Sequence, residues 1–512
     1  MNNATSSEIR KEEHAVADPH EVRRDELLHH LGRLLPDAAQ ASAFGAAMTT
    51  EPVASIRLNT LMPMAATLRD RLHRHAAAVP WCGDAFVLAE SESQCGSTLE
   101  HALGAVYIQA KATTLAVEAL NPQPGERVLD MAAAPGGKAT QIAALMRNTG
   151  LLVANEPRRR RIPSLVGNLE RCGVHCAAVT RAPGTLLARH FHNYFDRVLL
   201  DAPCSGDGIL CKNQGMLRYW SVEDAGNKSH EQTGLIRAAF HTLRPGGTLV
   251  YSTCSLSTEE NEDVLLGLTQ RYGDLVELLP VTGVGEAGGI AADIAGQYPP
   301  GFSHAARVWP HLHHTEGAFV ARIRKTGPTE WQSRNTETAE REHQPEPGAR
   351  SLPSDGVQGR EYVEKQWGFQ VPVPPDQEIL QGGRDLQLRS QDSSAIKDRL
   401  GPMFVRAGMR VANLHKGHHY LTQQAIAMWS PMMSSPKSVV LNWDQARALF
   451  RNEAIRLEEP HAPGEAICWH DSWPLCRGIV RRDGQLESFL PRSLRGIEVQ
   501  RLLSPAAGEA SR

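Results

Sequence analysis

Five short apolar runs recur between about residues 121 and 325, and helical stretches separate them. The runs are VLDMAA, LLVANE, CAAVT, FDRVLLDAP and GGTLVYSTCS, and the helical stretches include KATQIAALM and TGLIRAAFHTL. Apolar runs too short for helices, alternating with longer helical segments, are typical of parallel strands joined by crossover helices. The pattern therefore predicts an α/β fold, a doubly wound sheet with helices on both faces.

The sequence changes character on both sides of this central segment. Residues 1–20 are polar and we expect a mobile tail, whereas helical spacing in DELLHHLGRLLPDAAQASAFGAAM and strand-like alternation in VASIRLNTL predict an N-terminal α+β extension over 21–112. The central domain would then span 113–326. Proline, glutamate and other polar residues predict a flexible linker over 327–360, and short strands with turns predict a small strand-rich C-terminal domain over 361–505.

Composition limits the class of protein. The chain has 512 residues, which suits about three domains, and its 54 basic and 57 acidic residues give a net charge of -3. Any nucleic-acid face must therefore be local. Nine cysteines without a disulfide framework suit a reducing compartment, and no segment is long and apolar enough to span a bilayer. We expect a soluble cytoplasmic protein with no membrane partner.

The loop AAAPGGK at 132–138 follows the first apolar run. It is not a Walker A loop, because Ala132 stands where the first glycine should be and Ala139 replaces the Ser or Thr, and GxGxxG is absent as well. What remains is a strand-to-helix turn in which Gly136 and Gly137 allow close backbone approach to a ligand. An ordinary structural turn fits the loop equally well.

Glu156 ends the next apolar run, about twenty residues after this loop, where acidic residues of such sheets bind ribose hydroxyls. Together the loop and the acid favour an adenosyl ligand, although an acid that complements a helix dipole is a common alternative. Arginines occupy the four positions 158–161 at the following helix start, where the dipole disfavours positive charge. They favour RNA phosphate contact, and a solvated basic face is the other interpretation.

Two cysteines, Cys204 and Cys254, close the last two apolar runs. Carbon 5 of cytosine is too weak a nucleophile to accept a methyl group unaided, so a thiolate must first add at carbon 6 while an acid near ring nitrogen 3 relieves the negative charge. Asp201 is placed for that acid role. A base must then remove the carbon 5 proton, and a second cysteine could assist. This chemistry leaves open which cysteine attacks.

Most of the chain resembles the Nop/Sun family of RNA cytosine carbon-5 methyltransferases. The resemblance rests on SIRLNT at 55–60, GAVYIQ at 104–109, AAAPGGK at 132–138, ANE at 154–156, DAPCSGDG at 201–208 and RPGGTLVYSTCSL at 244–256. It implies a class I methyltransferase sheet that binds S-adenosylmethionine, and a C-terminal RNA-binding region that resembles a PUA module. The implied cofactor-binding residues are Ala132, Ala133, Ala134, Pro135, Gly136, Gly137, Lys138, Glu156 and Asp201.

The resemblance also assigns the roles that chemistry leaves open. It implies that Cys254 is the nucleophile, that Cys204 is needed to release the product, and that Asp201 lies between cofactor and base, with Lys138 close to the reacting centre. The implied product is 5-methylcytosine in ribosomal RNA of the small subunit (16S), made by a monomer whose N-terminal extension also binds RNA. The same chemistry on tRNA is an alternative.

One residue departs from the family pattern. The family has an acid after the third strand that recognises the adenine ring, and Pro183 stands at that position here. Proline offers neither a carboxylate nor an amide hydrogen, and a lost hydrogen bond costs about 0.5–1.5 kcal/mol. We expect weaker cofactor binding. A catalytically weakened RNA-binding assembly factor is therefore the alternative from another functional class.

The remaining polar clusters give weaker signals. Cys172 and Cys176 flank His175, but their spacing suits zinc poorly, so we expect no metal. Aromatic and histidine side chains of the C-terminal region could stack RNA bases or fill a small core, and we favour the core for the tryptophans. These residues are His418, His419, Tyr420, Trp469 and Trp473.

Overall fold

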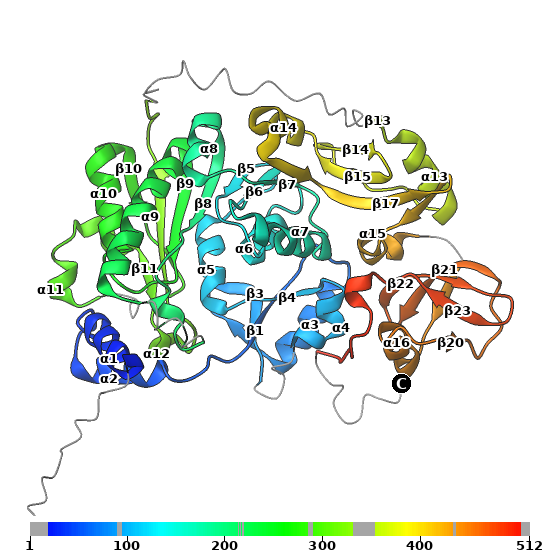
Figure 1. The fold of residues 1–512 in the computed structure, drawn as a ribbon, viewed down its shortest axis with the longest axis horizontal. Helices are drawn as coiled ribbons and strands as arrows, with labels where there is room; N and C mark the ends of the chain where they lie inside the picture. Colours follow the sequence, from blue (N-terminus) through cyan, green and yellow to red (C-terminus); the bar gives the residue numbers. More distant parts are fainter. Residues whose placement is uncertain are drawn as a thin grey trace, which may run out of the picture.

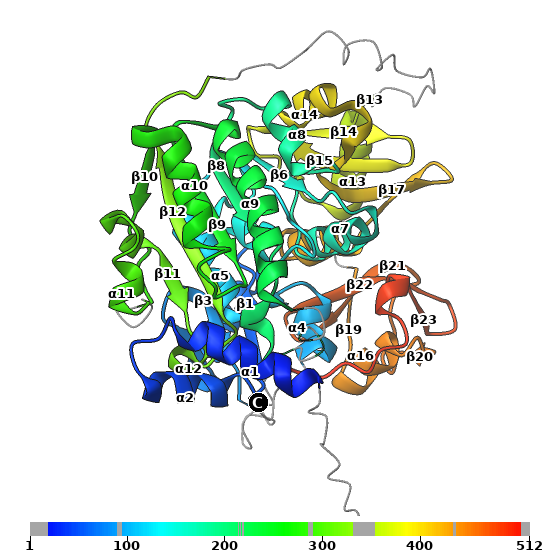
Figure 2. The ribbon, with the colours of Figure 1, turned by 60° about the vertical axis from the view of Figure 1, so that its left-hand side comes forward.

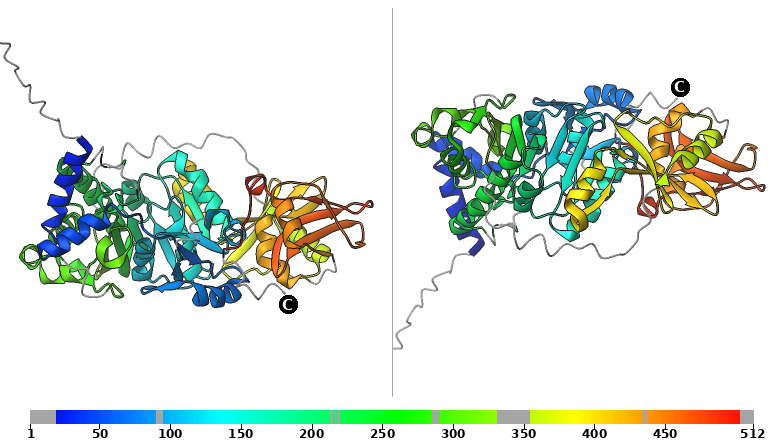
Figure 3. Two further views of the ribbon diagram at one scale, coloured as in Figure 1. Left: turned by 90° about the horizontal axis from the view of Figure 1, so that it is seen from below. Right: turned by 90° about the horizontal axis from the view of Figure 1, so that it is seen from above.

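A computed structural model describes residues 19–89, 95–212, 215, 217, 220–284, 290–330, 354–433 and 437–502. The predicted tail lies outside these residues except for its last two positions, where helix α1 begins, and 331–353 of the predicted linker lie outside them as well. Figure 1 shows a central sheet coloured cyan to green, with two C-terminal sheets beside it. Figure 3 shows that these C-terminal sheets form one end of an elongated molecule.

The central sheet has the strand order β10-β12-β9-β8-β5-β6-β7-β16, and β11 pairs with β12. Five parallel strands form its middle: β5 (Arg127–Asp130), β6 (Leu151–Asn155), β7 (Ala177–Thr180), β8 (Phe195–Asp201) and β9 (Leu243–Thr253). They coincide with the five apolar runs, which confirms the predicted α/β fold. Antiparallel strands extend the sheet to make it mixed, namely β10 (Val276–Leu279), β11 (Ala306–Val308) and β12 (Ala318–Lys325).

Successive strand residues point to opposite faces, and each face packs against its own helices. On one face Val128, Leu152 and Leu199 pack with α5, α6 and α7, whereas on the other Leu129 and Val153 pack with α8, α9 and α10. Figure 2 shows α8, α9 and α10 in front of the sheet. The helices are α5 (Lys111–Leu120), α6 (Gly137–Leu145), α7 (Ile162–Arg171), α8 (Gly184–His190), α9 (Val222–Thr242) and α10 (Glu262–Tyr272).

The N-terminal part divides between two places on this domain. Helices α1 (Pro19–Gly32) and α2 (Ala38–Ala47) pack through Leu31 and Phe44 on Leu256 and Trp309. A separate antiparallel sheet has the order β2-β3-β1-β4. Its strands and the nearby short helices are β1 (Ser55–Leu58), β2 (Ala77–Val79), β3 (Cys82–Val87), β4 (Val106–Ile108), α3 (Ala65–His75), α4 (Leu99–Ala102), α11 (Ala292–Ala295) and α12 (Pro310–His313).

The C-terminal region contains two five-stranded sheets, where the sequence suggested one small domain. The first consists of β13 (Ser354–Asp355), β14 (Gln377–Gly382), β15 (Asp385–Ser390), β17 (Met409–His415) and β18 (His418–Leu421). The second consists of β19 (Ser438–Val440), β20 (Ile455–Arg456), β21 (Gly464–His470), β22 (Trp473–Val480) and β23 (Gln485–Ser488). The helices here are α13 (Val357–Trp367), α14 (Ser393–Leu400), α15 (Gln423–Trp429) and α16 (Trp443–Phe450).

Contacts of several kinds join this region to the rest of the chain. Strand β16 (Phe404–Ala407) pairs antiparallel with β7 and so covers that edge of the central sheet. The last sheet shares one apolar core with the N-terminal sheet, in which Ile56 and Leu58 lie with Val439 and Leu475. The N-terminal sheet and the last sheet therefore pack together.

No helix in the described ranges is both long and apolar enough to cross a membrane. Within the same ranges, no cluster of three or more His, Cys, Asp or Glu side chains is arranged to hold a metal ion.

Candidate active site

Strands β8 and β9 are parallel neighbours, and their carboxyl ends carry the two cysteines to one point. The Sγ atoms of Cys204 and Cys254 lie 2.7 Å apart, and the backbone N–H of Cys254 donates to Sγ of Cys204 at 3.3 Å. Both are free cysteines and half-buried. The structure thus brings together two thiols that are 50 residues apart in the sequence.

Burial and the second thiol set the protonation of Cys204. The hydrogen bond with Cys254 is the main cause that raises the pKa of Cys204 well above its usual value, and burial adds to it. A raised pKa favours the protonated thiol of Cys204. Either sulfur can be the donor in this contact, so the geometry leaves open which cysteine attacks.

Asp207 connects the loop that contains Cys204 to the loop that contains Cys254. Its Oδ1 accepts from the backbone N–H of Leu256 at 2.6 Å, and its Oδ2 accepts from Oγ of Ser255 at 2.8 Å. The carboxyl is fully buried, and this burial, with the nearby Glu260, raises its pKa to about 7. Because Ser255 directly follows Cys254, this contact fixes the loop of Cys254 to the loop of Cys204.

Glu260 makes a second connection between the same loops. Its carboxylate accepts from the backbone N–H of Ser205 at 2.9 Å and from Nε2 of Gln232 at 2.7 Å. Its backbone carbonyl accepts from the hydroxyl of Tyr251 at 2.6 Å. A buried carboxylate with several donors is a rigid support for the loops that it joins.

Asp201 ends β8 beside the cysteines. Its Oδ2 lies 2.7 Å from Nζ of Lys138, and its Oδ1 accepts from Oγ of Ser252 at 2.9 Å. Burial opposes the charge of Lys138, but the carboxylate of Asp201 outweighs it and leaves the pKa of Lys138 raised. Lys138 is therefore charged, and the pair holds a proton donor next to the thiols.

The loop between β5 and α6 turns at Gly136, which is buried. Gly136 has a φ of 118°, and a Cβ there would lie 3.3 Å from that of Asn168. A glycine at this position therefore lets the turn pack closely against α7. Asp130 precedes the loop, and its Oδ2 is buried without a hydrogen-bond partner. Burial and then Asp201 raise the pKa of Asp130 to about 7.

Glu156 directly follows β6 and is almost fully buried. Its Oε1 accepts from the backbone N–H of Arg158 at 2.8 Å, and its Oε2 lies 3.1 Å from Nη1 of Arg161. Arg161 also donates to the carbonyl of Ala134 in the loop between β5 and α6. Arg161 therefore contacts both Glu156 and the loop at Ala134. The other three arginines, 158–160, are exposed, and their contact with RNA stays a prediction.

A cavity of about 720 Å³ connects these groups. Its lining includes Glu156, Pro183, Asp201, Cys204 and Cys254. Ala132 and Ala134 line it too, and Lys138 lines an adjoining cavity of about 300 Å³ that shares Asp201 and Cys254. Among the described residues, Ala133, Pro135, Gly136 and Gly137 line neither cavity. They belong to the turn that leads into α6.

The cavity wall suits an adenosyl group with a charged sulfur. Glu156 can accept from ribose hydroxyls, and Met131, Pro183 and Leu235 supply apolar surface for a ring. The carboxylates that line it are Glu156, Asp201 and Glu231, so acids remain although Pro183, at the start of α8, has none.

Sequence reasoning missed the buried acids Asp207 and Glu260. Asp207 lies in DAPCSGDG, and Glu260 lies near the end of TCSLSTEEN. Both are 0 % exposed. An acid so close to a reactive cysteine could have been noticed. Nothing local shows that it would be buried.

Comparisons with known proteins agree with this geometry. The model of the family "16S rRNA methyltransferase RsmB/F" matches residues 117–324, and that of the "N-terminal domain of 16S rRNA methyltransferase RsmF" matches residues 25–111. The ribosomal RNA small subunit methyltransferase F of Enterobacter sp. (strain 638) is 34% identical over 496 residues, which cover 92% of this chain and 95% of that protein. Its namesake in Vibrio cholerae serotype O1 (strain M66-2) is 35% identical, over 85% and 90% of the two chains.

A solved structure extends the likeness to the fold. The methyltransferase homolog protein from Pyrococcus horikoshii is 32% identical with a TM-score of 0.51, and the match covers 59% of this chain and 99% of that one. The two family models and the relatives that match nearly end to end identify the family. This chain therefore belongs to the RsmB/F family of 16S rRNA methyltransferases.

Proposed function

We propose that this protein methylates carbon 5 of a cytosine in small-subunit rRNA, with Cys254 as the nucleophile and Cys204 as the group that permits product release. The observation that carries the proposal is the meeting of the two thiols, 2.7 Å apart, with Asp201 at one end of a single cavity.

The protein is an S-adenosylmethionine-dependent rRNA methyltransferase, as its family membership shows. When bound, the cofactor supplies a methyl group on a positively charged sulfur. We assign its place to the cavity between Glu156 and Asp201, because the carboxylate, the apolar wall and the turn at 132–138 suit its parts.

Cys254 begins the chemistry. Its thiolate forms a bond to carbon 6 of cytosine, and the electrons of the 5,6 double bond move toward ring nitrogen 3. The pair of Lys138 and Asp201 supplies a proton at that nitrogen, which neutralises the developing charge. Carbon 5 then has the electron density to take the methyl group.

Cys204 acts after methyl transfer. Once Cys254 is bonded to carbon 6 it accepts no hydrogen bond and carries no charge, so the largest cause of the raised pKa of Cys204 disappears. Cys204 can then pass its proton to the Lys138–Asp201 pair and accept the proton from carbon 5. The 5,6 double bond re-forms, the bond to Cys254 breaks and nitrogen 3 returns its proton, so one proton is released overall.

We also propose that residues 21–112 and the PUA-like region 361–505 hold the RNA around domain 113–326. Removing a base from its stack costs a few kcal/mol, and phosphate contacts from flanking domains can offset that cost.

Nucleoside mass spectrometry tests this function. Unmethylated small-subunit particles, their naked rRNA and unmodified tRNA are each incubated with S-adenosylmethionine and either wild type or Cys254→Ala, with Cys211→Ala as the matched control because Cys211 lies outside the cysteine pair. We expect 5-methylcytosine in particles or rRNA with wild type and the control only. Product in tRNA alone, or none at all, would contradict the proposal.

A further inference from the structure

A second cavity, of about 900 Å³, lies where the central domain meets the N-terminal and C-terminal parts. Its wall comes from α4, from the last turns of α7, from β17, β18 and α15, and from the last sheet and the segment after it. It shares no lining residue with the cavity of the two cysteines. Nothing in the proposed reaction uses it.

An arginine between two aromatic rings forms one side of this junction cavity. The guanidinium carbon of Arg477 lies 4.4 Å from the ring centre of Tyr420 and 4.0 Å from that of Phe489. Phe489 is 36 % exposed, which is unusual for so large an apolar ring. Aromatic and guanidinium planes are the surfaces on which proteins stack unpaired bases.

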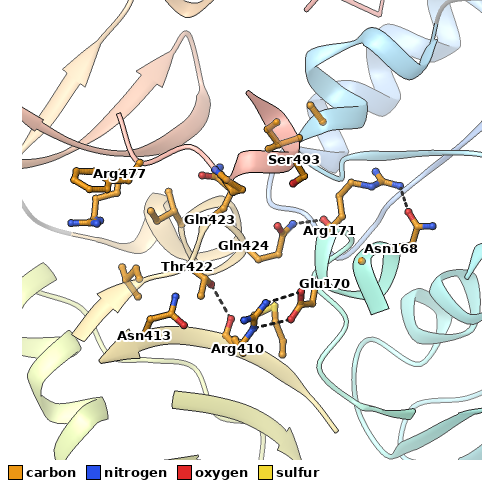
Figure 4. Close-up of a pocket in the computed structure, with 18 of the residues that line it drawn as sticks. Asn168, Glu170, Arg171, Arg410, Asn413, Thr422, Gln423, Gln424, Arg477 and Ser493 are labelled. Atoms are coloured by element: carbon orange, nitrogen blue, oxygen red, sulfur yellow. Dashed lines mark hydrogen bonds and ion pairs between the residues drawn. The ribbon is translucent and has the colours of Figure 1, made fainter. Parts of the chain in front are cut away.

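Amide side chains stand between this arginine and a second one. Figure 4 shows Gln423 and Gln424 between Arg477 and Arg171. Nε2 of Gln423 donates to the carbonyl of Leu475, whereas its Oε1 is buried with no hydrogen-bond partner. A ligand with N–H donors, such as the edge of a base, would satisfy that oxygen.

The charge of the lining is positive. Arg171, Arg410 and Arg477 line the cavity, and Glu170 is the single acid among its described lining residues. Glu170 is already bound by two arginines, since its Oε1 lies 2.6 Å from Nη1 of Arg406 and 3.1 Å from Nε of Arg410. Arg477 is also paired, since its Nη1 lies 2.7 Å from Oε1 of Glu465. Arg171 is the one lining arginine with no carboxylate partner among the described residues, and its charge favours a phosphate-bearing ligand.

Helix α7 connects this cavity to the active site. Asn168 lines the cavity, its Oδ1 accepts from Nη2 of Arg171 at 3.2 Å, and its Nδ2 donates to the carbonyl of Pro135 in the cofactor loop at 2.9 Å. From Arg161 beside Glu156 to Arg171, the helix rise of about 1.5 Å per residue gives about 15 Å.

We propose that the junction cavity binds one unstacked nucleotide of the rRNA substrate, separate from the target cytosine. Tyr420 and Phe489 would stack on the base, Gln423 would accept from its edge, and Arg171 would face the phosphate. The inference rests on the proposed rRNA substrate. It adds a recognition site that would fix the distance between a flanking nucleotide and the methylated one.

The test compares cavity variants with matched surface variants. The cavity variants are the double variant Tyr420→Ala with Phe489→Ala, and Arg477→Gln; the controls are Val440→Ala, which removes an exposed apolar side chain, and Arg482→Gln, which removes an exposed charge nearby. Calorimetric binding of S-adenosylmethionine checks that each variant folds. Filter binding gives Kd for small-subunit rRNA, and initial rates give kcat and KM.

The double variant should raise Kd and KM for rRNA by about 5- to 150-fold, the usual effect of losing base stacking, with kcat and cofactor affinity unchanged. The controls should match wild type, and ultraviolet crosslinking should join rRNA to the peptides containing Tyr420 or Phe489. If both cavity variants bind rRNA as wild type does, the inference is wrong. If wild type binds rRNA through the cavity but makes no 5-methylcytosine, the inference stands and the proposed function fails.

A further experiment distinguishes RNA from a free nucleotide as the ligand of the junction cavity. Nucleoside monophosphates at millimolar concentration are titrated against wild type and the double variant. Tight binding of a monophosphate that the double variant abolishes, with rRNA binding unaffected, would overturn the assignment to RNA.

Discussion

Replacing Asp207 with alanine should lower the methylation rate strongly, although the variant keeps both cysteines and its affinity for the cofactor. The carboxyl joins the two cysteine loops through the N–H of Leu256 and the hydroxyl of Ser255, at 2.6 and 2.8 Å. A hydrogen bond to a charged group contributes about 1.5–3 kcal/mol, but burial already raises the pKa of Asp207 to about 7, so part of that charge is absent near neutral pH. We expect a loss of about 2–4 kcal/mol in folding stability.

The effect on catalysis follows from geometry. Without Asp207, the residues directly after Cys254 lose their anchor, and a displacement of about 1 Å at a reacting atom costs about 100-fold in rate. Asp207 does not line the cofactor cavity, so cofactor affinity should change little. Asp207→Asn keeps an oxygen for the N–H of Leu256, and should recover most of the lost rate.

Single-turnover methylation of small-subunit rRNA measures this rate directly, and calorimetry with S-adenosylmethionine measures cofactor binding. Asp263→Ala is the matched control, because this acid is nearby but exposed and bonded only to the hydroxyl of Tyr298 among the contacts that the structure describes. A wild-type methylation rate for Asp207→Ala would refute the positioning argument. An equal loss in the Asp263 variant would also refute it.

Three further predictions concern release, pH and stability. Cys204→Ala should slow product release, so a covalent complex of RNA with Cys254 should accumulate on denaturing gels; rapid turnover without it would contradict the assigned role. The raised pKa of Asp130, about 7 against 3.8, means that the folded protein keeps a proton that the unfolded chain loses, so its contribution to stability falls by on the order of 4 kcal/mol as the pH rises from about 4 to about 7. Asp130→Asn removes this dependence, so the melting temperature of the variant minus that of wild type should increase from pH 5 to pH 8. If this difference is the same at both pH values, the argument from the buried acid is wrong. Arg307 makes two hydrogen bonds to Glu262, at 3.0 and 2.7 Å, and Arg307→Met should cost about 3–5 kcal/mol in denaturant unfolding, with partial recovery when Glu262 is also replaced by Gln.

Local patterns were enough to predict the central sheet. The apolar runs, the glycine turn at 132–138 and Glu156 are features of short segments, and strand β6 ends one residue before Glu156 as expected. The position of Cys204 and Cys254 at neighbouring strand ends follows from the same pattern, because β8 and β9 are parallel.

Long-range pairing could not be predicted in the same way. Strand β16 pairs with β7 although more than 220 residues separate them, and its four residues FVRA carry no mark of that partner. The shared core of the N-terminal sheet and the last sheet could not be predicted either, because an apolar face carries no mark of the face on which it packs. Asp207 and Glu260 look like surface acids in the sequence, since burial depends on the finished fold.

The identity of the attacking thiol is the central claim, and a trapped adduct tests it most directly. Wild-type protein is incubated with S-adenosylmethionine and small-subunit rRNA containing 5-fluorocytidine, whose fluorine cannot leave as a proton does, so the covalent complex persists with both cysteines present. After nuclease and trypsin digestion, mass spectrometry should place the nucleotide on the peptide containing Cys254. A nucleotide on Cys204, or no adduct on either cysteine, would contradict the account.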